Sequence, residues 1–186
     1  MKTFFLVSLA LIVVGVVLVS CASSRKKYET ARYDVLRTDG VFEVRKYSSL
    51  KVASTSNDAQ NGSFMRLFRY IDGANEKQEK LSMTTPVFME AGEMRFVVPE
   101  KSKDAVPKPA SDKVAVKELP ARTVATYRFS GRRSDRLEKE SVEKLRDWMK
   151  VNKMEPKGEA FFAYYDPPWT LGPLRRNEVL IPVESK

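Results

Sequence analysis

The chain has 186 residues, with 33 basic and 24 acidic side chains and a formal net charge of +9 at pH 7. It contains no histidine, which excludes histidine-dependent catalysis and the most common protein metal ligand. It contains one cysteine, so no disulfide can form within the chain and the core alone must stabilise it.

The N-terminal residues predict an export signal. Lys2 gives a minimal basic start, and the apolar run from Phe4 to Val19 follows. This run is short for a membrane span, which needs about 20 residues. It ends in Leu-Val-Ser-Cys, which resembles the bacterial lipobox, where the cysteine is lipidated and becomes the first residue of the mature protein. We therefore expect a signal peptide over residues 1–20, a lipid such as palmitate on Cys21, and a lipidated tether over residues 21–33.

An uncleaved N-terminal anchor with an incidental buried cysteine is the alternative. Ala22, rather than an aspartate, follows the cysteine, and by resemblance to lipoproteins this favours the periplasmic face of the outer membrane of a Gram-negative cell. The basic run Arg25-Lys26-Lys27 would then face phospholipid headgroups. Because an exported lipoprotein rarely meets nucleic acid, we expect no nucleic-acid partner, and we expect a monomer.

The first half of the remaining chain predicts strands around one helix. Residues 41–55 alternate with a period of two, with a bend at Ser48-Ser49. Residues 61–75 predict a helix, and two short strands follow up to residue 99. The helix carries an apolar stripe at positions i, i+3, i+4 and i+7, made of Phe64, Leu67, Phe68 and Ile71.

The second half repeats this order after a charged, proline-bearing linker over residues 100–113. A long strand pair or a bent strand over residues 116–131 precedes a helix that Ser134 caps. Two strands follow, the second over residues 177–183. The apolar stripe of this second helix is made of Val142, Leu145, Trp148 and Met149.

This order indicates an internal duplication, with halves over residues 34–99 and 114–184. Each half has one amphipathic helix and an open sheet, so neither half can cover its own apolar face. Packing the halves together predicts one α+β domain over residues 34–184, a duplicated βαββ repeat that forms a distorted antiparallel β-barrel or sheet flanked by two helices. We expect an apolar hollow with a basic rim between the halves.

Candidate catalytic residues are few. No glycine-rich phosphate loop and no metal-ligand spacing appears, so we expect no metal site. Asp166 and Glu178 are a conceivable pair of catalytic carboxylates. We prefer the alternative that Asp166 caps a turn and Glu178 pairs with Arg175 or Arg176, and we expect no enzyme.

Aromatic and cationic residues indicate a binding function more strongly. Tyr165 and Trp169 offer flat apolar surface in a stretch stiffened by prolines, and Arg175 and Arg176 follow as donors for a carboxylate. With the phenylalanines of the first helix, such groups suit a flat apolar ligand that carries carboxylates. Core packing of the phenylalanines and surface ion pairs of the arginines are alternatives that composition leaves open.

Two segments carry a resemblance to a known family. The runs FRYIDGAN…KLSMTTPV and YDPPWTLGPLRRNEV resemble the two signature segments of the SOUL haem-binding protein family, and the likeness extends from Tyr33 to Val183. It implies the same duplicated βαββ fold and noncovalent binding of haem or a related tetrapyrrole in an apolar pocket along the first helix. The corresponding positions are Phe64 and Phe68, with Arg69 placed to meet a propionate and the C-terminal loop nearby.

Histidine ligation, proposed for some members of that family, is impossible in this chain. Iron ligation would require a tyrosine or a methionine, for example Met65, Tyr70 or Met83, or would not occur. Two further functions stay open: an envelope scaffold or protein-interaction module without a small-molecule ligand, and an enzyme that processes a small ligand.

Overall fold

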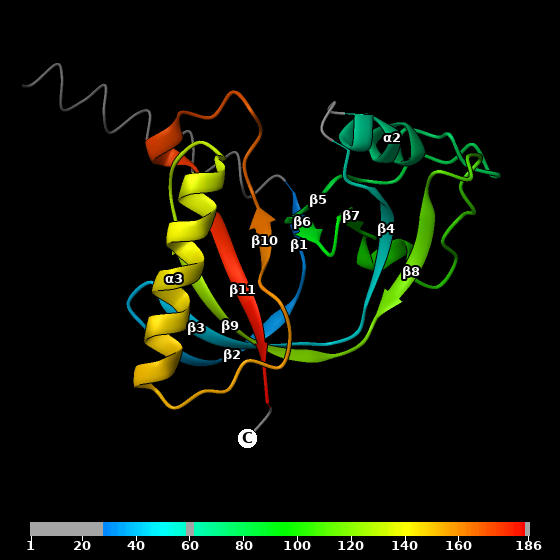
Figure 1. Ribbon diagram of the computed structural model, residues 1–186. Coiled ribbons are helices and arrows are strands. Elements are labelled where there is room, and N and C mark those ends of the chain that lie inside the picture. The colour runs from blue at the N-terminus through cyan, green and yellow to red at the C-terminus, as the bar shows by residue number, and fades with distance from the viewer. Residues whose placement is uncertain (1–27, 59–61, 185–186) are drawn as a thin grey trace, which may run out of the picture.

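The computed structural model describes residues 28–58 and 62–184. Within them, two α-helices pack on a strongly curled, antiparallel nine-stranded sheet that forms a half-barrel (Figure 1). The predicted signal peptide (1–20), the lipidation site Cys21 and most of the predicted tether lie outside the described residues. No helix in the described part of the chain is long and apolar enough to cross a membrane.

The helices are α2 (Gly62–Ile71) and α3 (Asp135–Val151), and the short 3-10 helices are η1 (Glu100–Ser102) and η2 (Gly172–Leu174). The large sheet has the order β2-β3-β9-β11-β10-β6-β7-β4-β8, and β1 pairs with β5 in a separate two-stranded sheet. The strands are β1 (Glu29–Thr30), β2 (Tyr33–Asp39), β3 (Phe42–Tyr47), β4 (Leu50–Ser56), β5 (Thr84–Thr85), β6 (Val87–Glu90), β7 (Glu93–Val97), β8 (Ala115–Leu119), β9 (Arg122–Phe129), β10 (Phe161–Tyr164) and β11 (Asn177–Val183).

The predicted duplication is visible in the strand order. β4, α2, β6 and β7 give three neighbouring strands in the order β6-β7-β4, and β9, α3, β10 and β11 give the matching order β10-β11-β9. The two repeats join where β6 and β10 pair antiparallel, with Phe88 opposite Ala163. The sequence-based prediction of a duplicated α+β fold flanked by two helices is therefore confirmed.

Two bent strands give the sheet its curl. β3 and β4 follow each other directly, as do β8 and β9, and the two bent strands pair in one register from Phe42–Tyr127 to Ser54–Ala115. One bend lies at the predicted position, residues 48–49, and the opposite bend contains Pro120, which lacks the N–H that a continuous ladder needs. Because both strands bend at the same point, β3 joins the second repeat while β4 stays in the first.

The strand alternation divides the core into layers. Val52 and Val124 are fully buried on the inner side of the curl. The next residues, Ala53 and Ala125, belong to the apolar clusters under α2 and α3. Figure 1 shows α3 lying along β9 and β11 and α2 lying at the far side of the sheet beside β4. The helices therefore cover the outer faces of the sheet, and side chains of the strands must fill the space on its inner face.

The two helices use their predicted stripes differently. Ser134 caps α3 by accepting a hydrogen bond from the Leu137 amide at 3.3 Å, as predicted. Leu145 and Met149 are buried beneath it. On α2, however, Leu67 and Ile71 are buried with Tyr70, whereas the other two members of the predicted stripe stay partly exposed.

Candidate functional site

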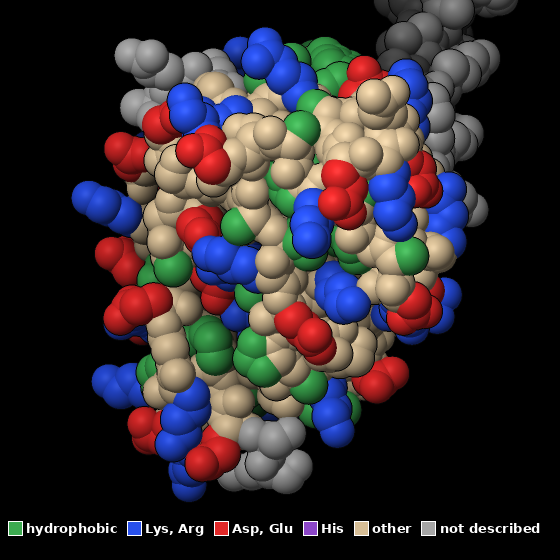
Figure 2. All heavy atoms as spheres, turned by 90° about the vertical axis from the view of Figure 1, so that its right-hand side faces the viewer, with side chains coloured by type: hydrophobic (Ala, Val, Ile, Leu, Met, Phe, Trp, Pro, Cys, Tyr) green, Lys and Arg blue, Asp and Glu red, His purple; other side chains and the backbone are tan. Residues whose placement is uncertain are grey.

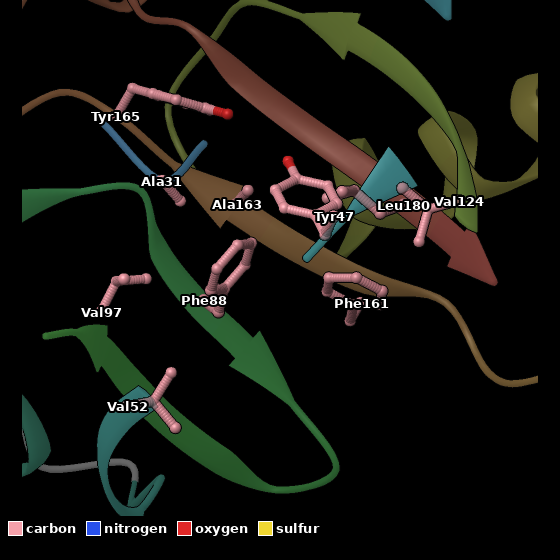
Figure 3. Packing of buried hydrophobic residues seen from close by; sticks show 10 residues of the cluster. All are labelled: Ala31, Tyr47, Val52, Phe88, Val97, Val124, Phe161, Ala163, Tyr165 and Leu180. Atoms are coloured by element: carbon pink, nitrogen blue, oxygen red, sulfur yellow. The ribbon is translucent and has the colours of Figure 1, made fainter. Parts of the chain in front are cut away.

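The space between the two repeats is filled with side chains. Tyr47, Phe88 and Phe161 point into it from β3, β6 and β10, and all three are at most 2% exposed (Figure 3). Their rings meet edge to face, at centroid distances of 6.4 Å between Tyr47 and Phe88 and 5.9 Å between Phe88 and Phe161. The predicted apolar hollow between the halves is therefore wrong, because aromatic residues at the inward positions occupy its volume.

A cleft of about 510 Å³ opens elsewhere, between β1, the bend before β4 and η1. Charged side chains of both signs line it, among them Glu29, Arg32 and Glu118. Such a polar, mixed-charge lining is unsuited to a flat apolar ligand. None of the site residues predicted from the sequence lines this cleft.

Apolar side chains gather instead on the outer surface of α2. Phe64, Met65 and Phe68, here called the α2 apolar surface, are 37%, 46% and 41% exposed. The rings of Phe64 and Phe68 stack with an interplanar angle of 14° and a centroid distance of 6.1 Å. Phe64 also packs edge to face on Phe96 of β7 at 5.3 Å, so the stacked pair rests on the sheet. The result is a small, flat, preformed aromatic surface open to a ligand.

The N-terminal end of α2 is fixed to β4 by polar contacts. Arg66 donates from Nε to the Thr55 hydroxyl at 2.9 Å and from NH1 to Asp58 at 2.7 Å. The Ser63 hydroxyl donates to the same aspartate at 3.1 Å. The side chain of Arg69, by contrast, is exposed and makes no hydrogen bond or ion pair with any residue of the described ranges, although its carbonyl oxygen accepts from the Ala74 amide at 2.9 Å. Its guanidinium, one helical turn from Met65, is available to an anionic group.

The proline-rich stretch forms a second feature, the proline loop (residues 166–175). Trp169 at its tip is 81% exposed, and Leu171 is 60% exposed. Arg175 holds the loop from inside by donating to the Thr170 carbonyl oxygen at 2.9 Å and to the Pro168 carbonyl oxygen. The predicted ligand donor Arg175 thus stabilises the loop backbone.

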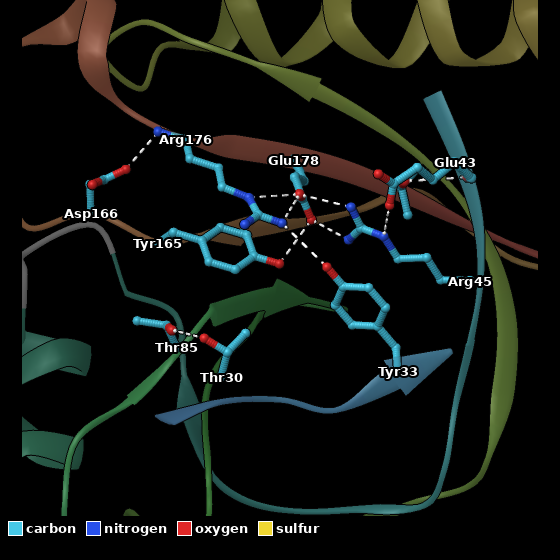
Figure 4. A network of polar contacts seen from close by, with 10 residues as sticks. Thr30, Tyr33, Glu43, Arg45, Thr85, Tyr165, Asp166, Arg176 and Glu178 are labelled. Atoms are coloured by element: carbon cyan, nitrogen blue, oxygen red, sulfur yellow. Dashed lines mark hydrogen bonds and ion pairs between the residues drawn. The ribbon is translucent and has the colours of Figure 1, made fainter. Parts of the chain in front are cut away.

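The other two predicted site residues lie inside the half-barrel, in a buried polar network (Figure 4). Its centre is Glu178 on β11, which is fully buried. Arg45 reaches this carboxylate with two N–H groups, at 2.6 and 3.0 Å, and Arg176 donates to it at 2.7 Å. The Tyr165 hydroxyl donates to the same carboxylate at 2.9 Å, and the Arg176 guanidinium lies over the Tyr165 ring at 4.1 Å.

The charges of this network keep Glu178 ionised. Burial alone would favour its neutral form, but hydrogen bonds and charge from Arg45, and then from Arg176, outweigh that effect, so the pKa of Glu178 lies below its ordinary value. The pKa of Tyr165 is raised well above its ordinary value, first by burial and then by the Glu178 charge. These hydrogen bonds and ion pairs tie β3 to β11 and to the residues that follow β10 and precede β11.

Asp166 and Glu178 make the contacts preferred from the sequence, a turn cap and an ion pair. Asp166 accepts a hydrogen bond from the Arg176 amide at 2.6 Å, which closes the turn before the proline loop. Glu178 pairs with Arg176, as predicted, and with Arg45, which sequence reasoning missed. No local pattern could have revealed Arg45, since 133 residues separate it from its partner.

The three candidate iron ligands differ in accessibility. Tyr70 is buried, its hydroxyl donates to the Pro107 carbonyl oxygen at 2.8 Å, and burial raises its pKa to about 12. Met83 packs against the apolar cluster under α2. Met65 is exposed beside the phenylalanine pair. The residues present therefore fit a tetrapyrrole held by its flat apolar face, with at most the weak thioether of Met65 available to a metal.

The predicted site residues thus form separate groups. Phe64, Met65, Phe68 and Arg69 share α2, Trp169 and Arg175 belong to the proline loop, and Tyr165 and Arg176 are internal. The side of the molecule that Figure 2 presents carries basic side chains interspersed with acidic ones, without a large field of one sign. Among these groups, the α2 apolar surface is exposed and flat, and the exposed side chain of Arg69 lies on the same helix.

The family described as SOUL heme-binding protein matches residues 28–182. The chain is 27% identical over 164 residues to Heme-binding protein 2 of Mus musculus, covering 78% of this chain and 80% of the mouse protein. It is 30% identical over 109 residues to Heme-binding protein 2 of Homo sapiens, covering 50% of this chain and 53% of the human protein.

Two solved structures share the fold at low sequence identity. The EcmrR C-terminal domain superposes with a TM-score of 0.56 at 17% identity, covering 83% of this chain and 99% of that domain. A hydrolase from Listeria innocua superposes with a TM-score of 0.51 at 10% identity, covering 80% of this chain and 94% of that protein. At these identities the likeness concerns the fold alone.

Proposed function

The chain belongs to the SOUL heme-binding protein family, and we propose that it binds haem or a related tetrapyrrole noncovalently on the α2 apolar surface, without histidine ligation and without catalysis. The observation that carries this proposal is the exposed, stacked pair of Phe64 and Phe68, which a buried core helix would not leave open. Covering aromatic surface with a flat apolar ring removes it from water, which is the main favourable term in such binding.

The polar part of the ligand has a matching group on the same helix. Arg69 is exposed and one turn from Met65, so its guanidinium can reach a propionate while the macrocycle lies on the phenylalanines. A bound haem would itself supply the redox-active iron. The residues of this chain supply apolar contact and one positive charge, so the affinity depends little on the metal.

The cellular setting that we propose follows the N-terminal sequence. Cys21 would carry the lipid after removal of residues 1–20, and the domain would sit as a monomer at the periplasmic face of the outer membrane. The proposed partners are a tetrapyrrole and the membrane that holds the anchor, and no nucleic acid.

A titration of a form that begins at residue 22 tests the binding proposal. This form keeps every residue of the three described apolar clusters. We expect haemin and iron-free protoporphyrin to bind with micromolar affinities within about threefold of each other, because no strong axial ligand acts on the iron. An Arg69→Glu variant should raise the dissociation constants of both ligands to the same extent, by roughly tenfold, which corresponds to the loss of one charge-assisted hydrogen bond. An Arg136→Glu variant, which changes an exposed arginine on α3, is the matched control.

A scaffold without a ligand is the second candidate, and the filled interior favours it, since Tyr47, Phe88 and Phe161 pack against one another inside the half-barrel. The same titration separates the two functions. Absence of any spectral change at micromolar haemin and protoporphyrin would contradict tetrapyrrole binding and leave the scaffold.

A further inference from the structure

Helix α2 and the proline loop, which both carry exposed apolar side chains, lie at one end of the domain (Figure 1). In Figure 1 the start of the described chain at β1, helix α2 and the loop between β10 and η2 all lie in the upper part of the view, while the C-terminus lies at the bottom. This upper end presents the α2 apolar surface and the exposed tip of the proline loop, Trp169 and Leu171. Several large apolar side chains are therefore exposed at the end where the chain enters the fold.

The length of the preceding segment ties this end to the proposed anchor. Only residues 22–27 separate Cys21 from Tyr28, the first described residue. A fully extended segment of this length spans about 25 Å. A domain of this size has a radius of gyration of about 15 Å, so its diameter exceeds that reach. With a lipid on Cys21, Tyr28 stays within about 25 Å of the bilayer, so the upper end can rest on the membrane.

The tip of the proline loop is held by backbone hydrogen bonds although it is exposed. The Thr170 amide donates to the Pro167 carbonyl oxygen at 3.0 Å, and the Leu174 amide donates to the Leu171 carbonyl oxygen at 2.9 Å. Arg175 holds the same backbone from below. Trp169 is 81% exposed in this hydrogen-bonded loop, so its indole is available to a partner outside the domain.

The surroundings of the loop suit a phospholipid surface. The Gly131 amide donates to the Gly172 carbonyl oxygen at 2.9 Å, which places the following residue, Arg132, beside the loop. Arg132 is exposed, and the chain as a whole carries a net charge of +9. Tryptophan prefers the boundary between headgroups and acyl chains, and nearby arginines attract anionic headgroups.

We propose that the proline loop inserts Trp169 and Leu171 into the headgroup region of an anionic phospholipid bilayer, so that the upper end of the domain rests on the membrane. The α2 apolar surface then opens beside the bilayer, where an apolar tetrapyrrole partitions. This inference rests on the lipid anchor of the proposed function and adds a second, protein-borne membrane contact.

The two tryptophans of the chain allow a direct test in the full-length lipidated protein. The protein is reconstituted in vesicles of phosphatidylethanolamine and phosphatidylglycerol that contain a doxyl-labelled lipid as a shallow quencher. A Trp148→Phe variant reports on Trp169 alone, and a Trp169→Phe variant reports on Trp148, which is held on α3 by a hydrogen bond to Asp39 at 2.8 Å. We expect the Trp169 signal to fall by about half and to shift to shorter wavelength, while Trp148 changes little.

The opposite outcomes overturn the proposal. A Trp169 emission that stays unquenched and at the wavelength of water-exposed indole, in protein that sediments with the vesicles, shows that the loop does not contact lipid. A blue shift that appears without vesicles and grows with protein concentration would assign the loop to a second copy of the chain. Tetrapyrrole titration in the absence of vesicles is unaffected by these results, so failure of this inference is distinguishable from failure of the proposed function.

Discussion

Replacing Glu178 by glutamine tests whether the buried network holds the fold together. The substitution keeps the volume but removes the charge that faces Arg45, which is 2% exposed, and Arg176, whose side chain is 25% exposed. Breaking one partner of a buried ion pair costs roughly 3–5 kcal/mol. Because Arg176 can turn partly toward water, we expect a loss of about 3 kcal/mol, a large fraction of the 5–15 kcal/mol typical of a domain.

The duplicated fold supplies the control. Glu93 is the first residue of β7 and Glu178 is the second residue of β11. Glu93 pairs with Lys117 at 2.5 Å and with Arg95 at 2.9 Å, but its own side chain is 23% exposed, whereas that of Glu178 is fully buried. Glu93→Gln should cost at most about 1 kcal/mol. Urea unfolding followed by circular dichroism measures both variants. A Glu178→Gln variant that loses no more stability than Glu93→Gln would refute the reasoning.

Two further predictions follow from burial and from the pKa of Glu178. Since that pKa is lowered in the folded state, the stability that the network contributes is present above the ordinary glutamate pKa of about 4.3 and is lost as the pH falls through the lower folded-state value. Unfolding midpoints measured from pH 7 to pH 2 should therefore decline in this acidic range, and they should decline less steeply in Glu178→Gln. Leu145→Ala, which empties a fully buried site under α3, should cost roughly 3 kcal/mol, whereas Leu171→Ala at a 60% exposed position should be nearly neutral; equal costs in denaturant titrations would contradict the assigned core.

The period-two and helical patterns predicted most of the fold because they report which faces of each element are apolar. The repeat of bent strand, helix and two strands was visible for the same reason, and the bend at residues 48–49 and the Ser134 cap are local features. These patterns could not predict which distant strands pair to close the curled sheet. The continuous register between the two bent strands depends on residues about 60 to 85 positions apart, which no local pattern encodes.

The candidate site was predicted by residue type rather than by geometry. An apolar stripe on a helix shows which side chains avoid water, but not how far the neighbouring strands cover them. Tyr70 takes a buried place because its hydroxyl finds the Pro107 carbonyl oxygen in the 100–113 segment, and the phenylalanine pair is left at the surface. Likewise, the inward volumes of Tyr47 and Phe88 decide against an internal hollow, and volume is a property of the assembled sheet.

The most direct test of the account is the affinity of protoporphyrin for a Phe64→Ser/Phe68→Ser variant. The exposed fractions of the two rings, 37% and 41%, amount to roughly 150 Å² of apolar surface, and a flat ligand that covers half of it gains about 2 kcal/mol. We expect the dissociation constant to rise roughly thirtyfold while the circular dichroism spectrum stays unchanged, and Val151→Ser, at an exposed apolar position on α3, to leave it unaltered. An unchanged dissociation constant in the double variant would contradict the assignment of the ligand site to α2.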